Sequence, residues 1–125
     1  MKKKTMSPSE QLAGFLNFVD QCTTEYRLAC DTVSEEDKRL QDLLHGIEFS
    51  ENRSEADKEL TKLRRSRKVR RENKDAVKRY QLIVEFFNDR NNKSTLNKMR
   101  QLLGRQRKEE EFLNSKRVYK PRVSS

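Results

Sequence analysis

The sequence has few of the residues that interrupt regular structure. Its 125 residues include three glycines, two prolines and no tryptophan. A turn-rich β fold needs such residues about every 8–12 positions, so their scarcity argues against an all-β architecture. Hydrophobic residues make up only 32% of the chain, against about 45–50% in ordinary globular domains, and charged residues make up 39%. Only narrow apolar stripes can be built from so little apolar material.

Long apolar runs are also missing. No stretch approaches the roughly 18 consecutive apolar residues of a membrane span. The charged start, Met1-Lys2-Lys3-Lys4, is not followed by the apolar segment of a signal peptide. The sequence therefore predicts a cytoplasmic protein with no membrane partner.

Residues suited to catalysis or metal binding are scarce. His45 is the one histidine, and Cys22 and Cys30 are the two cysteines. Eight residues on one helix rise about 12 Å. A disulfide needs Cα atoms within about 7 Å, so the two cysteines are interpreted as free core thiols, suited to a reducing compartment. With no glycine-rich phosphate loop, nucleophile elbow or HExxH motif, we predict no enzymatic activity, no catalytic residues, no metal site and no cofactor.

A heptad repeat is the clearest pattern in the chain. One apolar series recurs every seven residues: Leu12, Val19, Tyr26, Val33, Leu40 and Ile47. A second follows it by three residues: Phe15, Cys22, Ala29 and Leu43. Only Glu36 interrupts the second series. Two such series predict a long helix with a coiled-coil seam.

The expected bounds of this helix are residues 8–49. Ser7 is suited to cap it, Pro8 to its first position, and Glu10 to complete a capping box. Ser34 and Asp37 form a second possible capping box, so a break near residues 31–34 stays open as an alternative.

The expected second helix covers residues 55–90, with Ser54 as its cap. Its apolar stripe is Val69, Ala76, Tyr80, Ile83 and Phe87, flanked by Val77 and Val84. At about 100° per residue, Leu60 and Leu63 lie on nearly the opposite face. The stripe is therefore expected to change side between residues 63 and 69. Either the helix bends there, or Leu60 and Leu63 bind a partner.

A turn at residues 88–94 and a cap at Ser94 predict a third helix over residues 95–115. Gly104 either ends this helix or lies inside it. Residues 1–7 read as a loose basic leader and residues 116–125 as an extended basic tail, where Pro121 excludes a helix. Together these elements predict one all-α domain, a three-helix bundle of two long antiparallel helices forming a coiled-coil hairpin and a shorter third helix.

The charge is segregated along the chain. Residues 34–61 carry four basic and nine acidic residues, a net charge of −5, and residues 62–79 carry ten basic and two acidic residues, a net charge of +8. The candidate nucleic-acid-binding residues are Arg64, Arg65, Arg67, Lys68, Arg70, Arg71, Lys74, Lys78 and Arg79. Such a row can contact several phosphates. Two alternatives stay open: internal pairing with the acidic stretch at residues 31–42, and docking on an acidic protein.

Four segments carry a resemblance: LQDLLHGIEF at 40–49, RRSRKVRREN at 64–73, LLGRQRK at 102–108 and RVYKPRV at 117–123. Residues 40–123 resemble small helical proteins encoded in phages and prophages of Gram-positive bacteria. The resemblance implies a bacterial host cytoplasm and a mobile genetic element. In that setting small non-enzymatic proteins commonly bind DNA or block a host nucleic-acid machine, including CRISPR effectors. It implies no particular binding residues.

The function expected first is binding of nucleic acid or a nucleoprotein complex through the basic helix face. A second expectation is a protein–protein inhibitor of a host nucleic-acid machine, for example of the anti-CRISPR type, acting on a host protein. A third is a structural coiled-coil module that recruits a second copy as a homodimer. The position of Leu60 and Leu63 helps to separate these hypotheses, because exposed leucines mark a partner surface.

Overall fold

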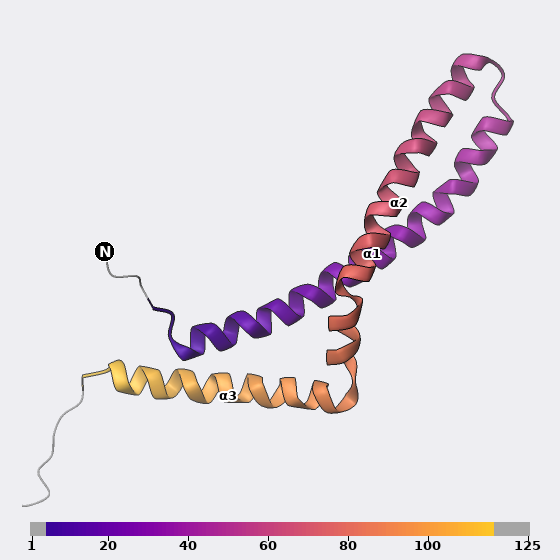
Figure 1. The fold of residues 1–125 in the computed structure, drawn as a ribbon. Coiled ribbons are helices and arrows are strands. Elements are labelled where there is room, and N and C mark those ends of the chain that lie inside the picture. The colour runs from indigo at the N-terminus through magenta and orange to yellow at the C-terminus, as the bar shows by residue number, and fades with distance from the viewer. Residues whose placement is uncertain (1–4, 117–125) are drawn as a thin grey trace, which may run out of the picture. The chain divides into compact units, whose positions relative to one another are not determined.

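A computed structural model describes residues 5–116, of which three helices account for 91%. They are α1 (Pro8–Glu48), α2 (Arg53–Asn88) and α3 (Arg90–Asn114), and no strand lies in this part of the chain (Figure 1). The predicted all-α class, with two long helices and a shorter third, is confirmed. None of the helices in residues 5–116 combines the length and apolar content that crossing a membrane requires.

Helix α1 is unbroken over its 41 residues, so the alternative break near residues 31–34 does not occur. The Ser7 hydroxyl oxygen accepts a hydrogen bond from the backbone N–H of Glu10 at 3.2 Å, which is the bond expected of Ser7 as the cap. The last helical residue is Glu48, one position before the expected end. The continuous heptad phase was therefore a better guide than the internal Ser34-to-Asp37 signal.

Helix α2 begins at Arg53 rather than at residue 55, because Asn52 and not Ser54 provides the cap. The Asn52 Oδ1 atom accepts from the backbone N–H of Glu55 at 2.9 Å. The Glu55 carboxylate reaches back to the N–H of Glu51 at 2.9 Å. Both Asn and Ser are good capping residues, so residue type alone does not decide between Asn52 and Ser54.

The expected turn at residues 88–94 is wrong. Helix α2 ends at Asn88 and α3 begins at Arg90, so the expected bounds 55–90 and 95–115 become 53–88 and 90–114. Asp89 has extended backbone angles and caps α3 by accepting from the N–H of Asn91 at 3.2 Å. One capping aspartate is therefore enough where a seven-residue turn was expected. Gly104 lies inside α3, whereas residues 117–125 of the expected tail and residues 1–4 of the leader lie outside the described residues.

The described chain forms two compact units. The first, Val19–Phe86, is a helical hairpin in which α2 runs antiparallel beside the second part of α1 (Figure 1). Five of its buried residues lie on the predicted seam of α1, and the sixth is Ser66 of α2; the five are Val19, Cys22, Ala29, Glu36 and Leu43. Every member of the second heptad series within this unit is buried, including the glutamate that interrupts it.

The second unit joins the start of α1, up to Phe18, with the chain from Phe87 onward. Leu16 and Leu96 are buried in it, at 5% and 4% exposed. The rings of Phe15 and Phe87 meet edge to face, with centroids 6.0 Å apart. Aromatic pairs prefer this geometry, so the contact fixes one end of the unit.

Candidate nucleic-acid interface

The seam of α2 continues where its apolar stripe was expected to change side. Two heptad series run along it: Leu63, Arg70, Val77 and Val84, and Ser66, Asn73 and Tyr80. All seven residues are buried or half-buried. The expected change of side is therefore wrong, because the polar residues Ser66, Arg70 and Asn73 occupy the seam between its two apolar parts. Leu63 belongs to this seam, whereas Leu60 is 44% exposed.

Glu36 forms a polar layer in the middle of the hairpin. It is only 4% exposed, and Ser66 of α2, which donates its hydroxyl hydrogen to the Glu36 carboxylate, is 5% exposed. The guanidinium of Arg39 pairs with the other oxygen of the same carboxylate. A buried carboxylate is costly unless both of its oxygens are satisfied, and here both have a donor. The single interruption of the heptad series was the sequence signal for this layer.

One of the nine candidate cations, Arg70, forms an ion pair with an acidic residue of the same chain. Its Nε atom lies 2.5 Å from Asp37 Oδ1, which joins α2 to α1. The side chain of Arg70 is 24% exposed and that of Asp37 is 50% exposed. The alternative of internal pairing therefore describes this residue, and Arg70 acts as part of the hairpin.

The other eight candidate cations are free of such pairing. All are exposed: Arg64, Arg65, Arg67, Lys68, Arg71, Lys74, Lys78 and Arg79. In the part of the chain that the structure describes, none of them forms an ion pair with an acidic side chain. The acidic stretch of α1 thus leaves most of the positive charge on the surface.

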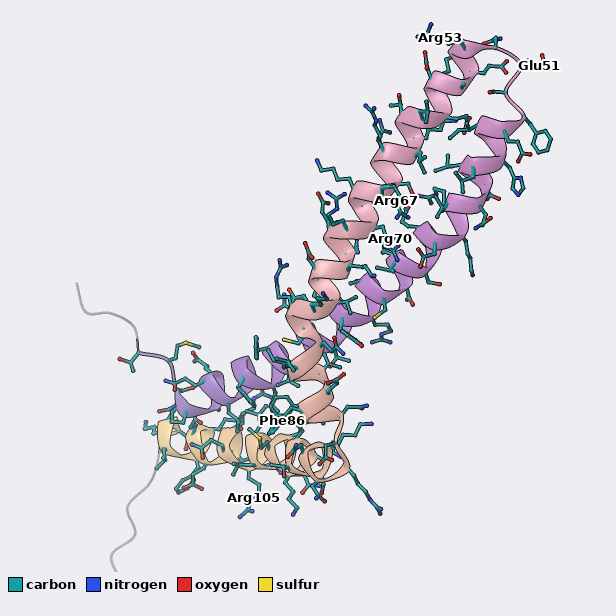
Figure 2. All side chains as sticks on the ribbon, turned by 45° about the vertical axis from the view of Figure 1, so that its right-hand side comes forward. Glu51, Arg53, Arg67, Arg70, Phe86 and Arg105 are labelled. Atoms are coloured by element: carbon teal, nitrogen blue, oxygen red, sulfur yellow. The ribbon has the colours of Figure 1, made fainter. Side chains whose placement is uncertain are left out.

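Five of these cations form a single row along α2, here called the basic row: Arg64, Arg67, Arg71, Lys74 and Lys78. They are spaced by three or four residues, so they share one face of the helix. From the first to the last the row rises about 21 Å. Arg67 and Arg70 lie near the middle of the hairpin, where α2 runs beside α1 (Figure 2). The row carries five positive charges on a rigid helix.

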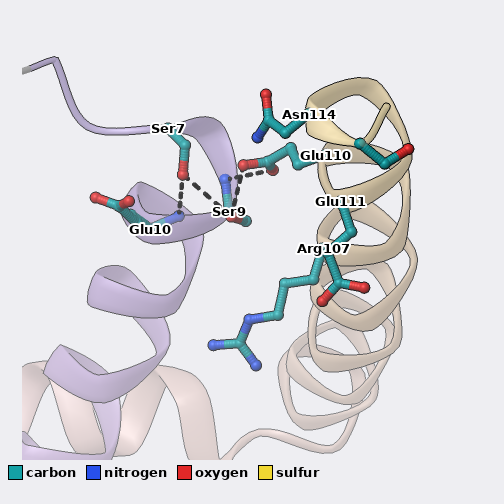
Figure 3. Close-up of a pocket in the computed structure, with 8 residues that line it drawn as sticks. Ser7, Ser9, Glu10, Arg107, Glu110, Glu111 and Asn114 are labelled. Atoms are coloured by element: carbon teal, nitrogen blue, oxygen red, sulfur yellow. Dashed lines mark hydrogen bonds between the residues drawn. The ribbon is translucent and has the colours of Figure 1, made fainter. Parts of the chain in front are cut away.

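A depression of about 500 Å³ lies in the second unit and is lined by Ser7, Ser9, Glu10, Arg107, Glu110, Glu111, Asn114 and Ser115 (Figure 3). The Glu110 carboxylate accepts from the Ser9 hydroxyl at 2.8 Å and from the Ser9 backbone N–H at 3.1 Å. The side-chain hydrogen bond from Ser9 is the main cause that lowers the pKa of Glu110. Glu110 therefore caps the start of α1 from α3, and we assign this contact a role in packing rather than in ligand binding.

The cysteines are free thiols. Cys22 is 2% exposed in the hairpin core, and Cys30 is half-buried. Among residues 5–116, no cluster of three or more histidine, cysteine, aspartate or glutamate side chains is arranged to hold a metal ion.

Searches of protein-family models, of curated proteins and of solved structures found no match to this chain. No activity or binding site is therefore transferred to it from another protein. The exposed charge of α2 is the feature of the described residues that most restricts the choice of partner.

Proposed function

We propose that this protein binds nucleic acid through a basic face of α2. The observation that supports the proposal is that eight of the nine candidate cations between Arg64 and Arg79 are exposed and have no acidic partner within residues 5–116. When such a surface neutralises phosphates, the cations condensed on the nucleic acid are released, which favours binding. In the setting that the resemblance implies, the protein acts as a non-enzymatic accessory factor of a phage or prophage in the host cytoplasm.

Contacts of this kind do not read sequence. Arginine and lysine bind phosphate oxygens, arginine often through two parallel hydrogen bonds, whereas sequence is read at base edges. We expect similar affinity for duplexes of different sequence and a steep loss of affinity with salt. A titration of the protein against fluorescent DNA at about 50 and 200 mM salt measures both properties.

Charge reversal tests the surface. Arg67→Glu with Arg71→Glu changes the charge by four units on the basic row, and we expect it to abolish retention on duplex DNA. Lys93→Glu with Lys98→Glu changes the charge equally on α3, where both lysines are exposed, and serves as the matched control. Circular dichroism checks that both variants keep their helices. Equal binding by the two variants would refute the proposal.

A second candidate is a protein–protein inhibitor of a host nucleic-acid machine. Leu60 lies one turn before the basic row and is 44% exposed, and Leu44 of α1 is 46% exposed. Apolar groups beside cations suit a protein surface that itself binds phosphates or acidic side chains. Leu60→Ser separates the two candidates, because it should weaken a protein complex and leave nucleic-acid binding unchanged.

A further inference from the structure

The two long sides of the hairpin differ in charge. The contact between Asp37 of α1 and Arg70 of α2 lies on one side of the seam between the two helices. It identifies the heptad positions of each helix that lie on that side. On that side α1 contributes Arg27, Cys30, Ser34, Asp37, Gln41 and Leu44, and α2 contributes the basic row. The one acidic residue of this α1 set is Asp37, which Arg70 neutralises. We call this surface the basic side.

The opposite side carries both signs. It contains a groove of about 230 Å³ lined by Glu36, Arg39, Leu43, Lys62, Arg65, Ser66 and Val69. On this side α1 exposes the acidic residues Glu25, Glu35 and Asp42, and α2 exposes Arg65 and Arg79. The field of these two arginines is therefore reduced by nearby acidic residues. Two of the eight exposed candidates thus lie in a weaker field than the basic row.

We infer that the basic side binds the phosphate backbone of double-stranded nucleic acid, and that Arg27 of α1 is a further contact residue. This inference rests on the proposed function and refines it. Arg27 is exposed and forms no ion pair within the described residues. The Glu36–Ser66 and Asp37–Arg70 contacts define the antiparallel register of the two helices. In this register Arg27 lies beside the Lys74–Lys78 end of the basic row.

The composition of the basic side favours a duplex over a single strand. Proteins that bind single strands stack the bases on aromatic side chains. No aromatic residue occurs in the α1 set from Arg27 to Leu44 or in the basic row. The basic row is about 21 Å long, and the major groove of B-DNA is about 12 Å wide. A row laid across that groove therefore reaches phosphates on both strands.

The expected salt dependence follows from the number of contacts. Six cations, the basic row and Arg27, predict a slope of log K against log salt of about −5 for duplex DNA. Each contact that is removed should reduce the slope by about 0.9. Two lost contacts lower the affinity about 10²-fold near 50 mM salt, and one lost contact lowers it about tenfold.

Two pairs of matched variants test the inference in the full chain. Arg64→Gln with Lys74→Gln removes two charges from the basic side, and Arg65→Gln with Arg79→Gln removes two from the opposite side. Arg27→Gln removes one charge from the basic side of α1, and Lys38→Gln removes one from an exposed position facing away from the seam. Each variant is titrated with a duplex and with a single strand of one sequence over a range of salt concentrations.

We expect Arg64→Gln with Lys74→Gln to lower the duplex affinity about 10²-fold and Arg27→Gln to lower it about tenfold, both with a reduced salt slope. The control variants should keep a duplex affinity within about threefold of that of the unaltered protein. Equal losses from both sides would overturn the inference and leave the proposed function standing. Tighter binding of the single strand would overturn the choice of a duplex. If the unaltered protein binds neither probe at low salt, the proposed function itself fails.

Discussion

Ser66 of α2 donates a hydrogen bond to Glu36 of α1 between two side chains that are each at most 5% exposed. This bond crosses the hairpin at a level where a coiled coil ordinarily places two apolar residues. It supplies a donor to a buried carboxylate oxygen, so each partner depends on the other.

Ser66→Ala should therefore destabilise the protein. The substitution leaves one oxygen of Glu36 without its donor, at a cost of about 1–3 kcal/mol. Urea unfolding followed by circular dichroism measures the change. Glu36→Leu together with Ser66→Ala replaces the polar layer with apolar groups and should recover or exceed the original stability, because a buried charge then no longer needs partners. A Ser66→Ala variant as stable as the original protein would contradict this account.

Arg70→Gln should have a smaller effect on stability. The pair with Asp37 is partly exposed, and such pairs contribute about 0.2–1 kcal/mol and weaken with salt. The free energy of unfolding at low and high salt measures this contribution. Arg71→Gln, on the basic row, is the control: it should leave stability unchanged but lower duplex affinity more than Arg70→Gln does. The reverse order of affinities would show that Arg70 itself faces the ligand.

Glu110 should make the protein sensitive to acid. Its hydrogen bonds from Ser9 hold its pKa below the ordinary 4.5. A carboxylate with a lowered pKa stabilises the fold above that ordinary value, and the stabilisation is lost as the pH falls through the pKa of the folded state. Thermal unfolding from about pH 7 to about pH 3 should therefore show Glu110→Gln less stable at neutral pH, with a difference from the original protein that shrinks as the pH falls. A constant difference across that range would show that the hydrogen-bonded carboxylate is not the cause.

Tyr26 should ionise above its ordinary pKa of 10.0. The thiol of Cys30, one turn further along α1, is the main cause that raises this pKa, with burial and Glu85 adding to it. Stability from such a group is present below the ordinary pKa and is lost as the pH rises through the raised value. Ultraviolet titration of the tyrosines measures the shift, and Cys30→Ala should move the Tyr26 transition toward 10.0. An unchanged transition in Cys30→Ala would rule out the thiol as its cause.

The glycines should respond differently to alanine. A methyl group at Gly104 meets no atom within 4 Å, so Gly104→Ala should gain the difference in helix propensity, about 0.5–1 kcal/mol. A methyl group at Gly46 would lie 2.7 Å from Glu59 Oε2, so the glutamate must move and the gain should be smaller. Urea unfolding of the two variants compares them directly. A larger gain at Gly46 would show that this contact carries no constraint.

The sequence predicted the bounds of a helix well where the heptad pattern was continuous. The phase from Leu12 to Ile47 predicted α1 almost to its last residue, and the signal near Ser34 could not override packing along the whole helix. The seam of α2 was harder to predict because polar residues occupy its middle. A wheel at about 100° per residue placed Leu63 about 120° from Val69, where the expected stripe begins, although Leu63 lies only about 40° from Val77, which belongs to the seam.

The candidate site was predicted as a list of charges but not as a surface. The sequence selected nine cations, and it could not show that Arg70 is the one that pairs with Asp37. It also did not select Arg27, which stands outside the basic stretch and joins the basic row only through the antiparallel register of the two helices. Residue spacing within one helix predicts a face, whereas the combination of two faces depends on contacts between helices.

The polar layer also has a consequence for how the chain selects its pairing during folding. If α2 slipped by one heptad along α1, Glu36 would face Glu59 or Asn73 instead of Ser66, and Asp37 would lose Arg70. Two carboxylates in one layer repel each other, and a slip in the other direction breaks the ion pair. Apolar layers alone would tolerate either slip, since leucine, valine and alanine pack in many combinations. The charged layer therefore selects one alignment of the hairpin, and with it the alignment of Arg27 with the basic row.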